Sequence, residues 1–371
     1  MKRSPKFVLA ILMLVASYQV QAESTYNPII NSVPSLTISP DAVASGMGDL
    51  GAATLPDVNS QFWNPSKYAQ SESASGFSLS FTPWLSQLVS DINLSYLSGF
   101  YKLDDKQALS ASLRYFSLGE VILAEYLGDQ GYSIQPYEMA VDFGYSRLLS
   151  DNFSMGVALR YILSDLMVSE DAPGSAFAAD ISGYYKVPLY FGREKGSFAL
   201  GANVSNIGTK ISYDGGNSSY FIPTNLRLGT SVHYPIDKFN ALNISLDLNK
   251  LLVPTPKSDT IYTSDIPSIP GIFKSFSDAP GGFKEELQEI YGSLGMEYVY
   301  NNQFFVRGGY YYENQYKGNR KFFSLGAGFK MSMFRLDASY LISQAQASPL
   351  DGTLRFTLAF DMQGIGMLLG R

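Results

Sequence analysis

The sequence predicts an all-β fold, namely a fourteen-stranded antiparallel transmembrane β-barrel with an N-terminal plug in its lumen. Three observations predict it. The chain contains many strands with one apolar and one polar face, which indicates a different solvent on each side. Short and long connections alternate between these strands, as is typical of membrane barrels. A Gly-rich segment without strands comes just before the first strand, and it could fill the lumen of so wide a barrel.

The N-terminus predicts a secretory signal peptide. Lys2, Arg3 and Lys6 give a basic start, an apolar run follows, and small residues lead to a cleavage site after Ala22. The apolar run is much shorter than the roughly 20 residues that a membrane-spanning helix needs. We therefore expect an exported chain that is cleaved after Ala22.

The composition argues against several classes of function. The chain of 371 residues has no Cys, a single His and a net charge of −6. It therefore has no thiolate for a metal site or disulfide, and no cluster of imidazoles. A chain with a net negative charge also lacks the basic surface that nucleic-acid binding needs. The 26 Tyr and 24 Phe fit the aromatic girdles of a membrane barrel. We expect no metal, no cofactor and no nucleic-acid partner.

The Gly/Ala-rich segment, residues 41–69, is the predicted plug. Pro56 and Pro65 interrupt it, and it contains no convincing strand. The chain thus divides into a signal peptide (residues 1–22), a periplasmic or luminal plug segment (23–75) and a barrel with large external loops (76–371). The candidate plug residues are Gly46, Gly48, Asp49, Trp63, Asn64 and Pro65.

Alternation with a period of two marks the strands. In residues 242–249, polar side chains take one face, and the apolar face consists of Leu242, Ile244, Leu246 and Leu248. Most such runs have about 9–11 residues, the length that a tilted strand needs to cross a bilayer. Fourteen runs are centred near residues 80, 96, 112, 142, 158, 181, 201, 229, 245, 296, 308, 326, 338 and 357.

The connections give an independent test of a membrane barrel. If the first strand runs outward, short turns and long loops should alternate, and both termini should lie on the periplasmic side. The predicted short turns are residues 102–106, 149–152, 235–239 and 301–303 and the turn at Ser332, with a turn of middling length at 188–196. The predicted long loops are residues 117–136, 164–175, 206–224 and 250–289.

The longest predicted loop, residues 250–289, is far longer than a hairpin needs. It opens Pro-rich and then offers one short amphipathic helix with Phe283, Leu287 and Tyr291 on one face. One interpretation is a partner-binding surface, because binding residues favour loops on rigid scaffolds. The alternative is a lid that stiffens the barrel mouth. The candidate partner-binding residues are Phe273, Phe276, Phe283 and Leu287.

Charged residues fall on the predicted luminal faces. The acidic ones are Asp142, Asp180, Asp247, Glu297 and Asp337, and the basic ones are Arg114, Arg160, Arg227, Arg307, Arg335 and Arg355. Buried charges must be paired to be tolerated, so we expect a salt-bridged interior, with a solute path as the alternative. Ser231 and His233 share a luminal face, but no third group to orient them is identifiable, so we interpret them as polar lining residues and predict no enzyme.

The plug segment also carries a family resemblance. Residues 46–69 read GMGDLGAATLPDVNSQFWNPSKYA, and this run resembles the N-terminal region of the PorV family of the type IX secretion system. Residues 81–85 and 110–120 are similar to the same family. Asn64-Pro65 is shared with the wider group of FadL-like barrels, although Ser66 stands where that group usually has Ala. The C-terminus departs from the usual outer-membrane pattern of a terminal aromatic residue, because Phe360 closes the last strand and eleven residues follow it.

The resemblance implies a FadL-like barrel in the outer membrane that acts as a shuttle and not as an enzyme. It implies that the chain docks beside the large translocon barrel and binds cargo proteins through their C-terminal signal domains. It would then pass the cargo to the surface sortase and attachment complex. Residues 118–136, 206–224 and 250–289 would be the contact loops, with outer-membrane lipid around the barrel. The alternatives are a FadL-like transporter of hydrophobic compounds and, on Ser231 and His233, a lipid-modifying enzyme.

Overall fold

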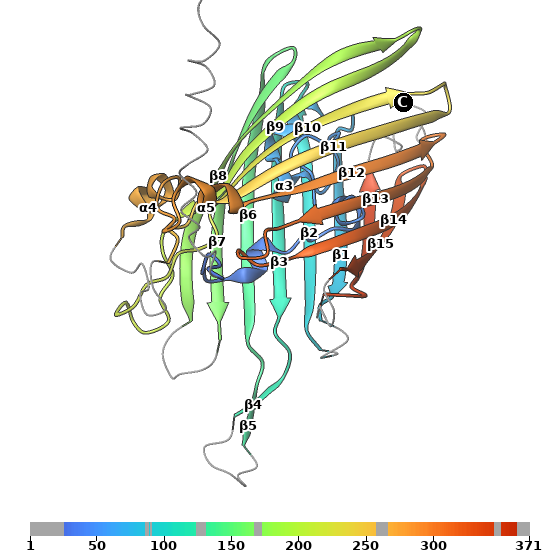
Figure 1. Ribbon diagram of the computed structural model, residues 1–371. Coiled ribbons are helices and arrows are strands. Elements are labelled where there is room, and N and C mark those ends of the chain that lie inside the picture. The colour runs from blue at the N-terminus through green and yellow to red at the C-terminus, as the bar shows by residue number, and fades with distance from the viewer. Residues whose placement is uncertain are drawn as a thin grey trace, which may run out of the picture.

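The computed structural model describes residues 26–85, 89, 91–123, 131–166, 173–256, 266–344 and 350–361. Within these residues, fourteen strands form one closed barrel in which neighbouring strands are antiparallel (Figure 1). This confirms the predicted fold class. The barrel strands are β1 (Ser75–Pro83), β2 (Asn93–Asp104), β3 (Gln107–Ser117), β6 (Tyr137–Ser150), β7 (Phe153–Asp165), β8 (Gly174–Phe191), β9 (Glu194–Gly208), β10 (Asn225–Pro235), β11 (Asn240–Leu251), β12 (Ile290–Tyr300), β13 (Phe304–Tyr312), β14 (Lys321–Met331), β15 (Phe334–Ser343) and β16 (Leu354–Asp361).

Each strand separates two environments. Along β7, exposed and buried residues alternate almost without interruption, and Leu159 on the outer face is exposed while the adjacent Arg160 is buried. The barrel closes where β1 pairs with β16, and the rings of Phe77 and Phe360 stack there at 4.5 Å. The outer surface is therefore apolar and the lumen polar. Among the described residues, the helices are all too short or too polar to cross a membrane.

The connections alternate in length as predicted, with one correction. The expected middling turn at residues 188–196 is wrong, because β8 and β9 stay paired from Pro188 with Ser197 to Phe191 with Glu194. Only residues 192–193 remain as the turn. Pro188 lies beyond Tyr185, where pairing of β8 with β7 ends, so its missing N–H interrupts no ladder on that edge.

The plug lies inside the barrel (Figure 1). It consists of four short helices, η1 (Pro34–Thr37), α2 (Ala42–Ser45), α3 (Ser60–Trp63) and η2 (Pro65–Gln70), which are mostly buried. The chain then enters β1 at the rim that carries the short turns. The candidate plug residues thus all belong to a segment that the barrel encloses.

The first described residues lie at the opposite rim. The backbone N–H of Asn27 donates to Tyr316 O, and that of Ser32 donates to Phe221 O, and both acceptors are in long connections. The expectation that both termini share one rim therefore holds for the two ends of the barrel, Ser75 and Asp361, and is wrong for the segment before the plug. The predicted signal peptide and the cleavage site at Ala22 lie outside the described residues.

Two long connections carry structure of their own. A hairpin of β4 (Val121–Leu123) and β5 (Tyr132–Ile134) projects from the barrel (Figure 1). The longest connection contains α4 (Ser268–Lys274) and α5 (Phe283–Gln288). Helix α4 was not predicted from the Pro-rich part of the loop; Pro270 lies in its first turn, where proline is tolerated. Residues 124–130 and 257–265 of the predicted contact loops lie outside the described residues.

The predicted helix containing Tyr291 is wrong at its end. Helix α5 stops at Gln288, and Ile290 already pairs with Lys250 in the barrel. Tyr291 instead belongs to β12, where its hydroxyl donates to Asn225 Oδ1 at 3.0 Å. The strand ladder, formed with residues far away in the sequence, prevails over the local helical spacing.

Candidate functional site

The plug backbone lies directly against glycines of the barrel wall. A Cβ on Gly201 of β9 would lie 1.9 Å from Ala52 O, and one on Gly309 of β13 would lie 2.0 Å from the carbonyl carbon of Met47. On β7, a Cβ on Gly156 would lie 2.8 Å from Ser66 N. Glycine is required where two backbones approach so closely. The plug is thus in contact with strands on several sides of the lumen.

The glycine motif at the start of the plug shapes a turn against β13 and β14. Gly48 has φ +84°, which favours glycine, and its N–H donates to Ser324 Oγ at 2.8 Å. Gly46 lies against Gly326, whose Cα is 3.1 Å from the place of a Cβ on Gly46. Asp49 follows with φ +60°, and its Oδ1 is 3.9 Å from Nη1 of Arg355.

The Trp63-Asn64-Pro65 motif makes hydrogen bonds to other parts of the plug. Trp63 Nε1 donates to Asp41 Oδ2 at 2.7 Å, and Asp41 Oδ1 accepts the Ala44 N–H that begins α2. Asn64 Nδ2 donates to Ala52 O at 2.9 Å and to Gly183 O of β8 at 3.0 Å. Pro65 occupies the first turn of η2, where its missing N–H costs no hydrogen bond. Asp41 is not among the candidate plug residues, although an Asp just before Ala42 is a recognisable helix N-cap.

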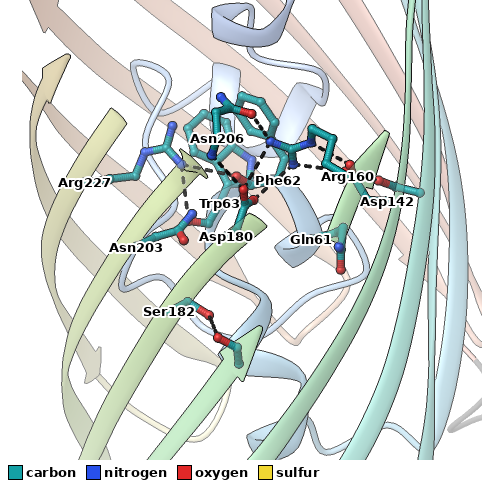
Figure 2. A network of polar contacts seen from close by, with 12 residues as sticks. Gln61, Phe62, Trp63, Asp142, Arg160, Asp180, Ser182, Asn203, Asn206 and Arg227 are labelled. Carbon is teal, nitrogen blue, oxygen red and sulfur yellow. Dashed lines mark hydrogen bonds and ion pairs between the residues drawn. The ribbon is translucent and has the colours of Figure 1, made fainter. Parts of the chain in front are cut away.

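Part of the lumen is salt-bridged, as expected. Arg160 lies between Asp142 and Asp180, with its Nε 2.6 Å from Asp142 Oδ1 and its Nη2 3.1 Å from Asp180 Oδ2 (Figure 2). Arg307 joins Glu297 and Asp337 in the same way, at 2.6 and 2.8 Å. These charges satisfy one another within the wall.

Other luminal charges bind the plug instead of one another, which the sequence did not predict. Arg227 Nη1 donates to Trp63 O at 3.2 Å (Figure 2), and Arg114 Nη1 donates to Ile38 O at 3.0 Å. Asp247 Oδ2 accepts from the N–H groups of Gly51 and Ala52 at 2.8 and 2.9 Å. Because charge-assisted hydrogen bonds are stronger than neutral ones, these contacts fix the plug firmly.

Lys67 completes this arrangement from within the plug. Its buried Nζ donates to Gly51 O at 3.0 Å and to Thr54 Oγ1 at 2.9 Å. The peptide groups next to Gly51 therefore lie between the Asp247 carboxylate on the wall and the Lys67 ammonium group in the plug. Wall and plug thus hold the same stretch of backbone from two sides.

The structure gives Ser231 and His233 separate partners. Ser231 Oγ accepts from Ser245 Oγ at 2.8 Å, and His233 Nδ1 lies 2.7 Å from Asn243 Oδ1. The two side chains do not form a hydrogen-bonded pair that could activate a nucleophile. In the described part of the chain, the His, Asp and Glu side chains form no group of three or more suited to a metal ion.

Helix α5 packs through its acidic residues and presents its apolar residues to solvent. Glu286 and Glu289 pair with Lys250 of β11 at 3.0 and 2.5 Å, and Glu285 pairs with Lys317 at 2.5 Å. Surface helices normally bury the apolar face and expose the charged one. On α5, the exposed fractions are instead 78% for Phe283 and 52% for Leu287. Phe273 in α4 is 72% exposed, and Phe276, just after α4, is 49% exposed.

Burial and hydrogen bonds set the pKa values of the carboxyl groups around α5. Burial raises the pKa of Asp278, whose Oδ2 accepts the Thr255 N–H. Burial would also raise the pKa of Glu285, but hydrogen bonds from Lys317, Gly281 and Asn27 hold it below its ordinary value. Glu285 is therefore held in its charged form by its neighbours.

Together, a closed barrel with an apolar outer face, a plugged polar lumen and long loops at one rim define an outer-membrane β-barrel protein. A family model described as type IX secretion system protein PorV matches residues 21–258. The chain belongs to this family and is an outer-membrane component of the type IX secretion system, which confirms the resemblance of residues 46–69. The family is that of a secretion-system protein and not of an enzyme class.

Solved structures give weaker similarities. The Pseudomonas putida toluene transporter TodX is 10% identical with a TM-score of 0.48, over 90% of this chain and 98% of that chain. The Ralstonia pickettii toluene transporter TbuX is 10% identical with a TM-score of 0.45, over 86% and 97% of the two chains. A Pseudomonas aeruginosa FadL homologue is 11% identical with a TM-score of 0.45, over 91% and 100%. A search of curated proteins finds no match to this chain.

Proposed function

We propose that this protein binds the C-terminal signal domains of cargo proteins at the type IX translocon and passes them to the surface sortase and attachment complex. The proposal rests on the orientation of α5, whose acidic residues face the barrel and whose apolar residues face solvent. Phe283 and Leu287 remain exposed because the glutamates of α5, and not its apolar side chains, face the barrel. Phe273 in α4 and Phe276 just after it are also exposed. Exposed apolar patches at loops are the usual mark of a binding surface.

The fixed plug favours a role outside the lumen. Ala52 and Met47 meet Gly201 and Gly309 of the wall backbone to backbone, and Asp247 and Arg227 hold the plug by charge-assisted bonds. A plug that moved aside for a solute would break these buried contacts on several strands at once. A protein that handles cargo through its outer loops needs no such movement.

The proposal assigns partners to the outer rim. The large translocon barrel, the cargo signal domains and the surface sortase and attachment complex would meet residues 118–136, 206–224 and 250–289, and outer-membrane lipid would surround the strands. The β4–β5 hairpin and helices α4 and α5 give two of these loops a defined shape.

The test is to replace Phe283 and Leu287 together by serine and to recover the protein from solubilised outer membranes through a tag placed after Arg371. We expect at least a tenfold loss of recovered cargo proteins, because truncating anchors at the centre of an interface typically costs about 2 kcal/mol or more each. The matched control replaces Ile236 and Phe239, which are exposed apolar residues at the opposite rim, by serine.

Undiminished cargo recovery in Phe283→Ser with Leu287→Ser would contradict the proposal. Recovery of the barrel with bound lipid or fatty acid, and without cargo or a large barrel, would favour the transporter of hydrophobic compounds instead.

A further inference from the structure

The first described residues and the first plug helix η1 form a strap along the outer rim, defined here as residues 26–37. At its start, Asn27 N–H donates to Tyr316 O at 2.9 Å. The side chain of Asn27 donates from the same Nδ2 to Pro256 O at 3.2 Å and to Glu285 Oε1 at 3.0 Å. A single residue of the strap thus contacts the β13–β14 connection and both ends of the described part of the longest loop.

The rest of the strap is anchored to the wall. Val33 and Leu36 are buried in an apolar cluster with residues of β6, β7 and β8. Further anchors are the Ser35 N–H, which donates to Glu138 Oε2 at 3.2 Å, and the Ser32 N–H, which donates to Phe221 O. Because these anchors belong to strands β6–β8 and the connection before β10, the strap joins α5 to the barrel wall.

Lys317 meets the strap at the same carboxylate. Its Nζ lies 2.5 Å from Glu285 Oε1, the oxygen that also accepts from Asn27, and 3.0 Å from Glu289 Oε1. The Lys317 side chain is buried. Two donors from distant parts of the chain therefore converge on one glutamate of α5.

Helix α5 needs such tethers because little else within it can fix its position. It has six residues, and its N-cap Gly282 offers no side-chain hydrogen bond. Isolated helices of this length are not stable in water. Its apolar side chains do not pack on the barrel, so its direction depends on what holds its glutamates.

We propose that Asn27 and Lys317 are positioning residues that hold the apolar face of α5 toward a partner. The inference rests on the proposed function, in which that face binds cargo. The strap then does more than fill the rim, because it links α5 to the plug and the barrel wall, whose positions are fixed.

The experiment uses trypsin on intact outer membranes, with cleavage after the exposed Lys284 of α5 as the readout. We expect Asn27→Ala and Lys317→Met to speed this cleavage about tenfold, because each removes a hydrogen bond to a charged, largely buried group. Lys317→Arg should restore slow cleavage. The matched control is Lys321→Met, which removes a nearby lysine that lies over Tyr312 and not on α5.

Cargo recovery is measured on the same variants. Faster cleavage with at least a fivefold loss of cargo in Asn27→Ala supports the inference. Unchanged cleavage overturns it, whatever the cargo does, and so does faster cleavage with full cargo recovery. Failure of the proposed function has a different signature, because Phe283→Ser with Leu287→Ser would then keep its cargo.

Discussion

Single residues decide how closely the plug meets the wall. Gly309 and Gly201 have no Cβ, and this lets the carbonyl groups of Met47 and Ala52 lie where a side chain would otherwise be. Asp41 has a comparable role within the plug, since its two carboxylate oxygens join the start of α2 to the ring of Trp63. These contacts are steric and directional, so even conservative substitutions should destabilise the protein.

We predict that Gly309→Ala destabilises the protein by about 1–3 kcal/mol or more, the usual cost of overpacking, because backbone cannot move aside as a side chain can. The neighbouring Gly308→Ala is the matched control, since its Cβ would meet no atom closer than 4.0 Å. The free energy of unfolding in urea, measured in detergent micelles, compares the two variants. Equal stability of both would contradict the close docking of the plug.

At the scale of the element, α5 shows a helix whose mounting depends on charge. Buried ion pairs contribute little net stability compared with apolar packing of similar volume. The pairs of Glu286 and Glu289 with Lys250 therefore make sense less as a source of stability than as a way to keep Phe283 and Leu287 outside. The position of α5 should in consequence respond to pH.

The pKa of Glu285 gives that pH dependence its sign. Because its pKa in the folded protein lies below the ordinary 4.5, its contribution to holding α5 is complete above pH 4.5 and is lost as the pH falls through the lower value. We predict that the α5 amides exchange hydrogen about tenfold faster in Glu285→Gln than in the parent at pH 7, with the ratio approaching one as the pH falls below the lowered pKa.

Comparing the two proteins at each pH removes the intrinsic pH dependence of exchange and the opposing titration of Asp278. The amides of α4 serve as an internal reference within the same loop. A ratio that stays the same while the Glu285 carboxylate of the parent becomes protonated would show that its charge does not hold α5.

On the scale of the whole molecule, the chain runs through its own barrel. From residue 26 onward, it runs from the rim of the long connections down the lumen as the plug and enters β1 at the rim of the short turns (Figure 1). Long loops face outward in outer-membrane barrels. The strap should therefore lie on the cell surface, although it precedes a strand that starts on the periplasmic side.

This topology predicts the labelling of two cysteine variants by a membrane-impermeant maleimide. Tyr26→Cys, at a residue that is 66% exposed, should react in intact cells. Lys238→Cys, in the exposed turn between β10 and β11, should react only after the outer membrane is broken. The parent chain has no Cys and gives a clean background. Reaction of Lys238→Cys but not Tyr26→Cys in intact cells would invert the topology.

The sequence by itself determined the barrel. Strand periodicity and turn length are local properties, so all fourteen strands and the alternation of their connections could be read from neighbouring residues. The plug could be inferred from what the barrel must enclose. The family resemblance rested in the same way on a contiguous run, residues 46–69.

Only the tertiary structure decided what the plug and the loops touch. Asp247 meets Gly51 across almost two hundred residues, and Asn27 meets Glu285 across still more. No local pattern encodes such pairs, and a luminal charge looks the same in the sequence whether it binds the wall or the plug. Tyr291 was misplaced for a related reason, since pairing with a distant strand outweighed helical spacing. The orientation of α5 likewise depends on Lys250 and Lys317, which only the closed barrel brings next to its glutamates.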